Sequence, residues 1–255
     1  MILGSGVRSA CFALVLVCLS VAPVESASAF GDATEVEIVS LDVSRGDDRS
    51  QSVTERLAWE VRKRSSVEPM LEPGRARLGD DSLFRSPFIY WRGTDEIAPF
   101  SEESVDALRR YVHRGGFILV DDGSAGSEGF DRAVRRELLR AFPATPLKPI
   151  PDDHTIYRSF YLLDRPVGRL AGPEFLEGIK YGDRIAIVYS RHDLGGALQR
   201  DKLGAWSQAV VPGGERQRES AIRLAINIVL YALCTDYKDD QVHAPFIMRR
   251  RGSGP

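Results

Sequence analysis

The chain has 255 residues, of which 34 are lysine or arginine and 36 are aspartate or glutamate, so its formal net charge at pH 7 is −2. This balance lacks the basic excess of nucleic-acid-binding proteins, and we predict no nucleic-acid partner. Two of the three cysteines, Cys11 and Cys18, lie within residues 1–29, which leaves Cys234 alone in the rest of the chain. One cysteine excludes an internal disulfide framework, so an apolar core must supply the stability.

Residues 1–29 have the pattern of a secretory signal peptide. Arg8 supplies a positive charge, residues 10–22 form an uncharged apolar run, and Ala27 and Ala29 are the small residues that signal peptidases require. The run is short for a membrane span, which needs about 20 apolar residues. We therefore predict a periplasmic or secreted protein that starts near Phe30 and has no membrane span after cleavage. An uncleaved membrane anchor is the alternative.

Strand and helix patterns then alternate along one predicted domain, residues 30–244. Short runs rich in β-branched and aromatic residues predict strands at 35–43, 67–71, 88–91, 117–120 and 184–189. Apolar residues at helical spacing predict helices at 52–64, 101–114, 130–142 and from 215 onward, and residues 156–163 fit a strand or a loop. Ser52 and Glu55 have the spacing of a capping box, and Ser101 is an expected N-cap. Residues 245–255 are predicted to be a flexible basic tail.

This alternation indicates an α/β fold with a mostly parallel sheet and helices on both faces. Residues 115–124, GGFILVDDGS, stand out as its central strand. The uninterrupted apolar run from Phe117 to Val120 is typical of a parallel strand buried on both faces. It ends in a polar turn of Asp121, Asp122, Gly123 and Ser124.

Ligands of open α/β sheets bind beyond the carboxyl ends of the strands, and three polar doublets are candidates for that edge. Asp121-Asp122 and His192-Asp193 directly follow strands, whereas Asp153-His154 lies in a long connection. Carboxylates and imidazoles suit a divalent metal or acid–base catalysis. Their spacing matches no metal fingerprint, so no cofactor is predicted and a divalent metal is the alternative. These residues could equally cap turns and helices.

Aromatic and basic side chains extend this candidate site. Tyr157 and Tyr189 are expected near the same edge, and Arg191 belongs to the polar cluster after the last strand. Aromatic rings beside charged groups suit a sugar or peptide ligand, although packing in the core is the alternative. The predicted ligand-binding residues are Asp121, Asp122, Asp153, His154, Tyr157, Tyr189 and Arg191.

Several stretches together resemble a bacterial group, the domain-of-unknown-function family four-one-five-nine. They are PFIY (87–90), GGFILVDD (115–122), FD (130–131) with RRE (135–137), DH (153–154) with IYRSF (156–160), NIVLYAL (227–233), YK (237–238) and DQVH (240–243). The resemblance implies a flavodoxin-like fold related to class I glutamine amidotransferases, and it implies no established activity. Amidotransferases of that fold carry a cysteine nucleophile directly after a central strand, where this chain has aspartates and Ser124.

The leading hypothesis is therefore an exported, non-catalytic module that binds a small polar ligand or an envelope protein. One alternative is a hydrolase, with or without a metal, whose candidate catalytic residues are Asp122, Ser124, His154, His192 and Asp193. In that hypothesis Ser124 is the nucleophile and His154 or His192 is the base. A structural component of an envelope assembly is the third hypothesis.

Overall fold

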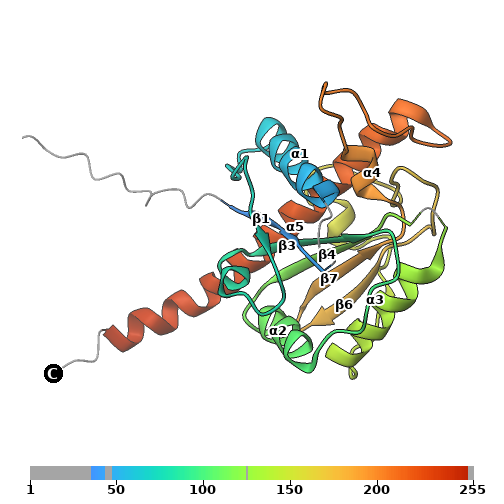
Figure 1. Ribbon diagram of the computed structural model, residues 1–255. Helices are drawn as coiled ribbons and strands as arrows, with labels where there is room; N and C mark the ends of the chain where they lie inside the picture. Colours follow the sequence, from blue (N-terminus) through green and yellow to red (C-terminus); the bar gives the residue numbers. More distant parts are fainter. Residues whose placement is uncertain (1–35, 44–47, 125, 252–255) are drawn as a thin grey trace, which may run out of the picture. The chain divides into compact units, whose positions relative to one another are not determined.

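The computed structural model describes residues 36–43, 48–124 and 126–251 (Figure 1). The predicted signal peptide and Phe30 lie outside these residues. Within them, seven strands form one sheet in the order β2-β1-β3-β4-β7-β6-β5. The strands are β1 (Ile38–Leu41), β2 (Arg75–Ala76), β3 (Phe88–Gly93), β4 (Phe117–Asp122), β5 (Lys148–Pro149), β6 (Glu177–Tyr181) and β7 (Arg184–Ser190).

The sheet is mostly parallel. Strands β2, β1, β3, β4 and β7 run parallel to one another. Strand β6 is antiparallel to β7, and β5 is antiparallel to β6. Taken in chain order, the five parallel strands have the arrangement 2-1-3-4-5 of flavodoxin-like sheets. The predicted α/β fold with its central strand at residues 117–120 is confirmed.

Helices cover both faces of the sheet (Figure 1). One face carries α1 (Asp48–Arg64), α4 (Leu194–Leu198) and α5 (Gly214–Arg251), and the other carries α2 (Glu102–His113) and α3 (Glu128–Ala141). Two short 3-10 helices, η1 (Asp81–Arg85) and η2 (Thr155–Tyr157), lie in the connections. No helix in the described part of the chain combines the length and apolar character needed to cross a membrane.

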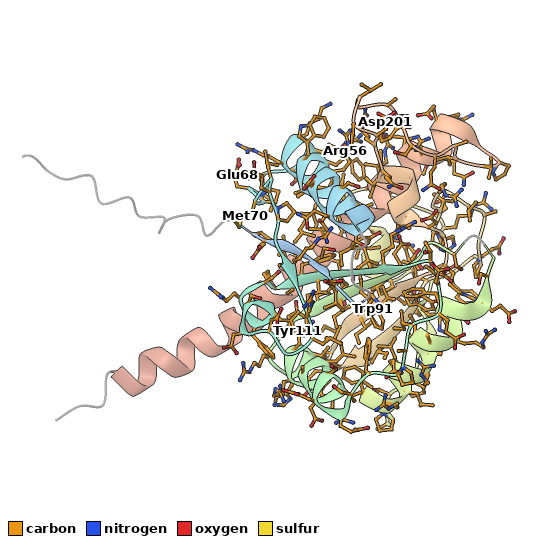
Figure 2. The ribbon with its side chains drawn as sticks, viewed as in Figure 1. Arg56, Glu68, Met70, Trp91, Tyr111 and Asp201 are labelled. Carbon is orange, nitrogen blue, oxygen red and sulfur yellow. The ribbon has the colours of Figure 1, made fainter. Side chains whose placement is uncertain are left out.

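The side chains of β3 and β4 alternate between the two cores, as the two-residue period of a strand requires. Phe117 and Leu119 belong to the core beneath α1, α4 and α5, and Ile118 and Val120 to the core beneath α2 and α3. The same alternation places Trp91 of β3 in the second core (Figure 2). It also decides where the polar residues at the strand ends point.

Three local expectations differ from the structure. Helix α1 begins at Asp48, so Ser52 lies inside the helix and the predicted capping box is wrong. Residues 67–71 contribute one isolated bridge, Val36 to Pro69, and the edge strand is β2 instead. Strand β6 was not expected, because its sequence, EGIKY, lacks an apolar run. Residues 156–163 form the end of η2 and a loop.

Candidate functional site

Asp121 and Asp122 are neighbours at the end of β4, but they face opposite sides of the sheet. Asp121 continues the series of Phe117 and Leu119 toward α4, and Asp122 continues the series of Ile118 and Val120 toward α3. The predicted site at this edge is therefore divided into a closed half and an open half.

The closed half is built around Asp121, which is fully buried. The backbone N–H of Leu194 donates to its Oδ1 at 2.9 Å, and the backbone N–H of Gly195 donates to its Oδ2 at 2.7 Å. The hydroxyl of Tyr90 also donates to Oδ2, at 2.8 Å. Asp121 thus fastens the first turn of α4 to the end of the central strand.

Two arginines compensate the buried carboxylates of Asp121 and Asp193. Nη2 of Arg92 donates to Oδ1 of Asp193 at 2.8 Å, and Nε of Arg92 lies 3.8 Å from Oδ2 of Asp121. Arg169 pairs with the other oxygen of Asp193. We call Asp121, Asp193, Arg92, Arg169 and Tyr90 the buried network. Its two carboxylates and two guanidiniums carry no net charge.

Asp193 also shapes the backbone at this point. It has a left-handed conformation, with φ of 53°, and its side chain accepts from the backbone N–H of Gly196 at 3.0 Å as the N-cap of α4. Such a conformation costs about 1–3 kcal/mol in a residue other than glycine, and the surrounding contacts must hold it. Asp193 therefore has a structural role in the network.

The electrostatics of Asp121 follow from its burial. Desolvation raises the pKa of its carboxyl to about 6, and the charge of Asp193 acts in the same direction. Burial, followed by the charge of Asp121, also raises the pKa of Tyr90, which keeps this hydroxyl protonated as a donor. Both carboxylate oxygens of Asp121 already accept hydrogen bonds from the protein, so this carboxylate has a structural role.

The open half is a cleft of about 620 Å³ on the α3 side of the same edge. Its lining comes from the turn after β4 and the start of α3, from residues 170–173, and from the Val211-Pro212 pair. The residues that line it are Asp122, Ser124, Gly126, Ser127, Glu128, Asp131, Leu170, Ala171, Gly172, Pro173, Arg191, Val211 and Pro212.

Asp122 lines this cleft and is only 8% exposed. Its Oδ1 accepts from the backbone N–H of Ser124 at 2.8 Å, and its Oδ2 lies 3.4 Å from the hydroxyl of Tyr189. Within the described residues it forms no ion pair with any lysine, arginine or histidine, in contrast to Asp131 beside it. The cleft therefore contains a nearly buried carboxylate without a counter-ion.

The other charges near the cleft are held by one another. Nε of Arg135 donates to Asp131, and its two terminal nitrogens donate to Glu177 at 3.1 and 2.6 Å. The hydroxyl of Tyr189 donates to Asp131 at 2.9 Å. Burial, followed by the charges of Asp122 and Asp131, raises the pKa of Tyr189, so its phenol stays a donor. Tyr189 thereby connects Asp122 to an ion-paired wall.

Arg191 supplies a positive charge to the same cleft. Asp121 pairs with Ser190 in the register of β4 and β7, so Asp122 and Arg191 follow at adjacent backbone positions, about 5 Å apart. The side chain of Arg191 is 35% exposed, and its Nε lies 3.6 Å from Glu177, which Arg135 already binds. Among the charged residues that line the cleft, Asp122 and Arg191 lie at neighbouring strand ends, whereas Glu128 and Asp131 belong to α3 and are ion-paired with Arg132 and Arg135.

Ser124 lines the cleft as part of a turn. Its hydroxyl donates to the backbone carbonyl of Ser127 at 2.6 Å, and Ser127 caps α3. Of the three histidines whose side chains the structure describes, none lines this cleft. The structure therefore does not pair Ser124 with His154 or His192.

His192 is buried behind the wall formed by residues 170–173. Its Nε2 lies 2.7 Å from the carbonyl oxygen of Pro173 and donates to it, so Nδ1 is left to accept from Ser190 at 3.3 Å. Burial lowers the pKa of His192, although the Pro173 carbonyl opposes this effect. Both ring nitrogens are occupied, and His192 anchors the wall of the cleft.

Asp153, His154 and Tyr157 lie elsewhere. His154 lines a second cavity, of about 560 Å³, together with Gly115, which precedes β4. Since Asp122 ends the same six-residue strand, the two cavities are separated by roughly 20 Å. Nδ1 of His154 accepts from the backbone N–H of Ile156, and Tyr157 is buried with its hydroxyl bound to the backbone of Leu176. These residues do not join Asp122.

The sequence could have indicated two further residues of this edge. Arg92 is the charged residue at the end of a buried strand, which is the same signal that identified Asp121. Asp131 lies in the first turn of α3, facing Tyr189. Residues 169–173 gave no signal, because their position depends on hydrogen bonds to the backbone of His192 and Asp193.

Comparison with known families identifies one group. The family described as domain of unknown function (DUF4159) matches residues 37–233, and the chain belongs to this family. This match confirms the resemblance seen in the sequence. Comparison with curated proteins gives no match. In the described part of the chain, no group of three or more His, Cys, Asp or Glu side chains is arranged to hold a metal ion.

Proposed function

We propose that this member of the DUF4159 family is an exported, non-catalytic module that binds a small polar ligand in the cleft between α3 and residues 170–173. The observation that carries the proposal is the nearly buried carboxylate of Asp122, which lines a cavity of about 620 Å³ and has no counter-ion among the described residues. Sites for small molecules usually measure about 300–1,000 Å³ and place a few polar groups among apolar walls. A ligand that neutralises or hydrogen-bonds Asp122 would complete this arrangement.

The hydrolase hypothesis has less support from the same geometry. A serine nucleophile needs a base within about 3 Å, and the Ser124 hydroxyl instead donates to the Ser127 carbonyl. Asp121 and Asp193, which could serve as acids or bases, are occupied by the buried network. A binding role instead relies on Asp122 and Arg191, which line the cleft and lie outside the buried network.

Export is supported by the signal-peptide pattern of residues 1–29. Expression of the full chain followed by cell fractionation and N-terminal sequencing tests it. We expect the protein in the periplasm or medium with Phe30 at or near its N-terminus. Retention in the cytosol with Met1 intact would contradict export.

Ligand binding is tested by screening the mature protein against a library of polar metabolites by thermal shift, with native mass spectrometry for co-purified molecules. The variant Ala171→Trp places an indole at an exposed position that lines the cleft, and Leu162→Trp is the matched control, since Leu162 is 85% exposed and does not line it. We expect at least one compound to stabilise the protein and the Leu162 variant, but not the Ala171 variant. If no compound binds, or if Ala171→Trp leaves binding unchanged, this cleft is not the site.

A further inference from the structure

We propose that the ligand of this cleft is a zwitterion, namely a free amino acid or a short peptide, whose ammonium group binds Asp122 and whose carboxylate binds Arg191. This inference rests on the proposed function and names the chemical class of the ligand. It follows from how charges are compensated at the ends of β4 and β7.

The first step concerns Asp122. A carboxylate that is only 8% exposed has lost most of its hydration, and within the described residues it has gained one backbone N–H donor and a long contact to Tyr189. Buried charges are normally paired, because removing an unpaired ion from water is unfavourable. An ammonium group offers both a positive charge and three N–H donors. It is therefore the ligand group that this carboxylate favours.

The second step concerns the neighbouring groups, which leave no other cation for Asp122. Arg135 is directed away from it by contacts to Asp131 and by two hydrogen bonds to Glu177. Arg191 is directed toward Glu177, which Arg135 already holds. The positive charge that compensates Asp122 is thus to be supplied from outside the chain.

The third step concerns Arg191. Its side chain is about one-third exposed and lines the cleft, and its only ion pair within the described residues is the 3.6 Å contact with Glu177. Guanidinium groups bind carboxylates through two parallel N–H donors. Because Asp122 and Arg191 start from adjacent backbone positions, they can contact the two charged ends of one small molecule.

The walls of the cleft fit the rest of such a ligand. The same cleft is also lined by apolar residues, namely Leu170, Ala171, Pro173, Val211 and Pro212. A volume of about 620 Å³ leaves space for a side chain or a second residue beyond the ammonium and carboxylate groups. Comparing the affinities of free alanine and of a dipeptide therefore shows whether the cleft favours a single amino acid or a short peptide.

The test is an NMR titration of the mature protein with alanine, alanyl-alanine, N-acetyl-alanyl-alanine and alanyl-alanine amide. We expect one of the two zwitterions to bind more tightly than either blocked peptide. Asp122→Asn should weaken the zwitterion about tenfold or more, since a hydrogen bond to a charged group contributes roughly 1.5–3 kcal/mol, but leave the weak binding of the acetylated peptide unchanged. Arg191→Gln should weaken the zwitterion and leave the amide unchanged.

Asp153→Asn is the matched control, because it removes an exposed carboxylate outside the cleft and should not change any of these affinities. Thermal unfolding of each variant shows whether the fold is retained. If the blocked peptides bind as tightly as the zwitterions, or if Asp122→Asn weakens all ligands equally, the assignment is wrong. If no zwitterion binds but another compound does, and Ala171→Trp abolishes its binding, the proposed function stands and this inference fails.

Discussion

The two aspartates at the end of the central strand differ in which face of the sheet they point to and in whether their charge is compensated. Asp121 is fully buried, accepts three hydrogen bonds and belongs to a network without net charge. Asp122, one residue later, lines a cleft and has no counter-ion within the described residues. The alternation of the strand causes this difference, because it sends one side chain beneath α4 and the other toward α3. One aspartate therefore serves the fold, and the other is free for a ligand.

The largest effect is expected from Asp121→Ala. The substitution leaves Arg92 paired with Asp193 alone, inside the protein, and removes the acceptor of the Leu194 and Gly195 N–H groups. Breaking a buried ion pair on one side typically costs about 3–5 kcal/mol. Urea unfolding of the variant should show a loss of this size. A loss below about 1 kcal/mol would show that the buried network does not stabilise the fold.

The pH dependence of stability should separate the two aspartates next. The pKa of Asp121 is about 6 in the folded protein, above its ordinary value, so the native state binds this proton more tightly than the unfolded chain does. Stability then falls as the pH rises from about 4 to about 6, and two pKa units correspond to roughly 3 kcal/mol. This contribution should be absent in Asp121→Asn, and unfolding curves across that pH range measure it. Equal slopes for the protein and the variant would contradict the raised pKa.

A smaller effect is expected from Gly195→Ala. A Cβ atom at this position would lie 2.3 Å from the hydroxyl of Tyr90 and 2.7 Å from the side chain of Arg92, so the buried network has to shift. Overpacking of this kind typically costs about 1–3 kcal/mol. Gly126→Ala is not a suitable control, because Gly126 has positive φ. Ser207→Ala is the control, because Ser207 is exposed and lies outside the buried network. If Gly195→Ala left the free energy of unfolding unchanged, α4 would not be closely packed against the buried network.

The smallest effect on stability is expected from Asp122→Asn. The substitution removes a carboxylate without a counter-ion and keeps an oxygen that can accept from the Ser124 N–H. We expect the free energy of unfolding to change by less than about 0.5 kcal/mol, or to rise slightly, in urea unfolding at neutral pH. A loss as large as that of Asp121→Ala would place Asp122 in the structural role that we assign to its neighbour.

The sequence predicted the sheet better than the site. The apolar run of β4 and the capping of α2 by Ser101 are local signals, and the structure confirms both. Strand β6 was not predicted, because its sequence, EGIKY, contains glycine and charged residues and no apolar run. Its pairing with β7 follows from a turn at Gly182 and Asp183.

The site depended on topology that no local pattern contains. Asp153 and His154 looked equivalent to the other doublets, but their connection places them near the start of β4 rather than its end. His192 and Asp193 follow β7 at the expected edge, yet hydrogen bonds to Pro173 and Gly196 turn them inward. Residue type and position along the strand predicted the edge, and tertiary contacts decided which groups remained free.

The central claim is that Asp122 and Arg191, at the ends of β4 and β7, form the binding site. Mapping of backbone amide shifts on addition of a bound ligand tests it most directly. We expect the largest shifts at Asp122, at residues 126–131 and 170–173, and at Arg191. Shifts centred instead on His154, Tyr181 and Tyr231, which line the second cavity at the opposite end of the sheet, would contradict it.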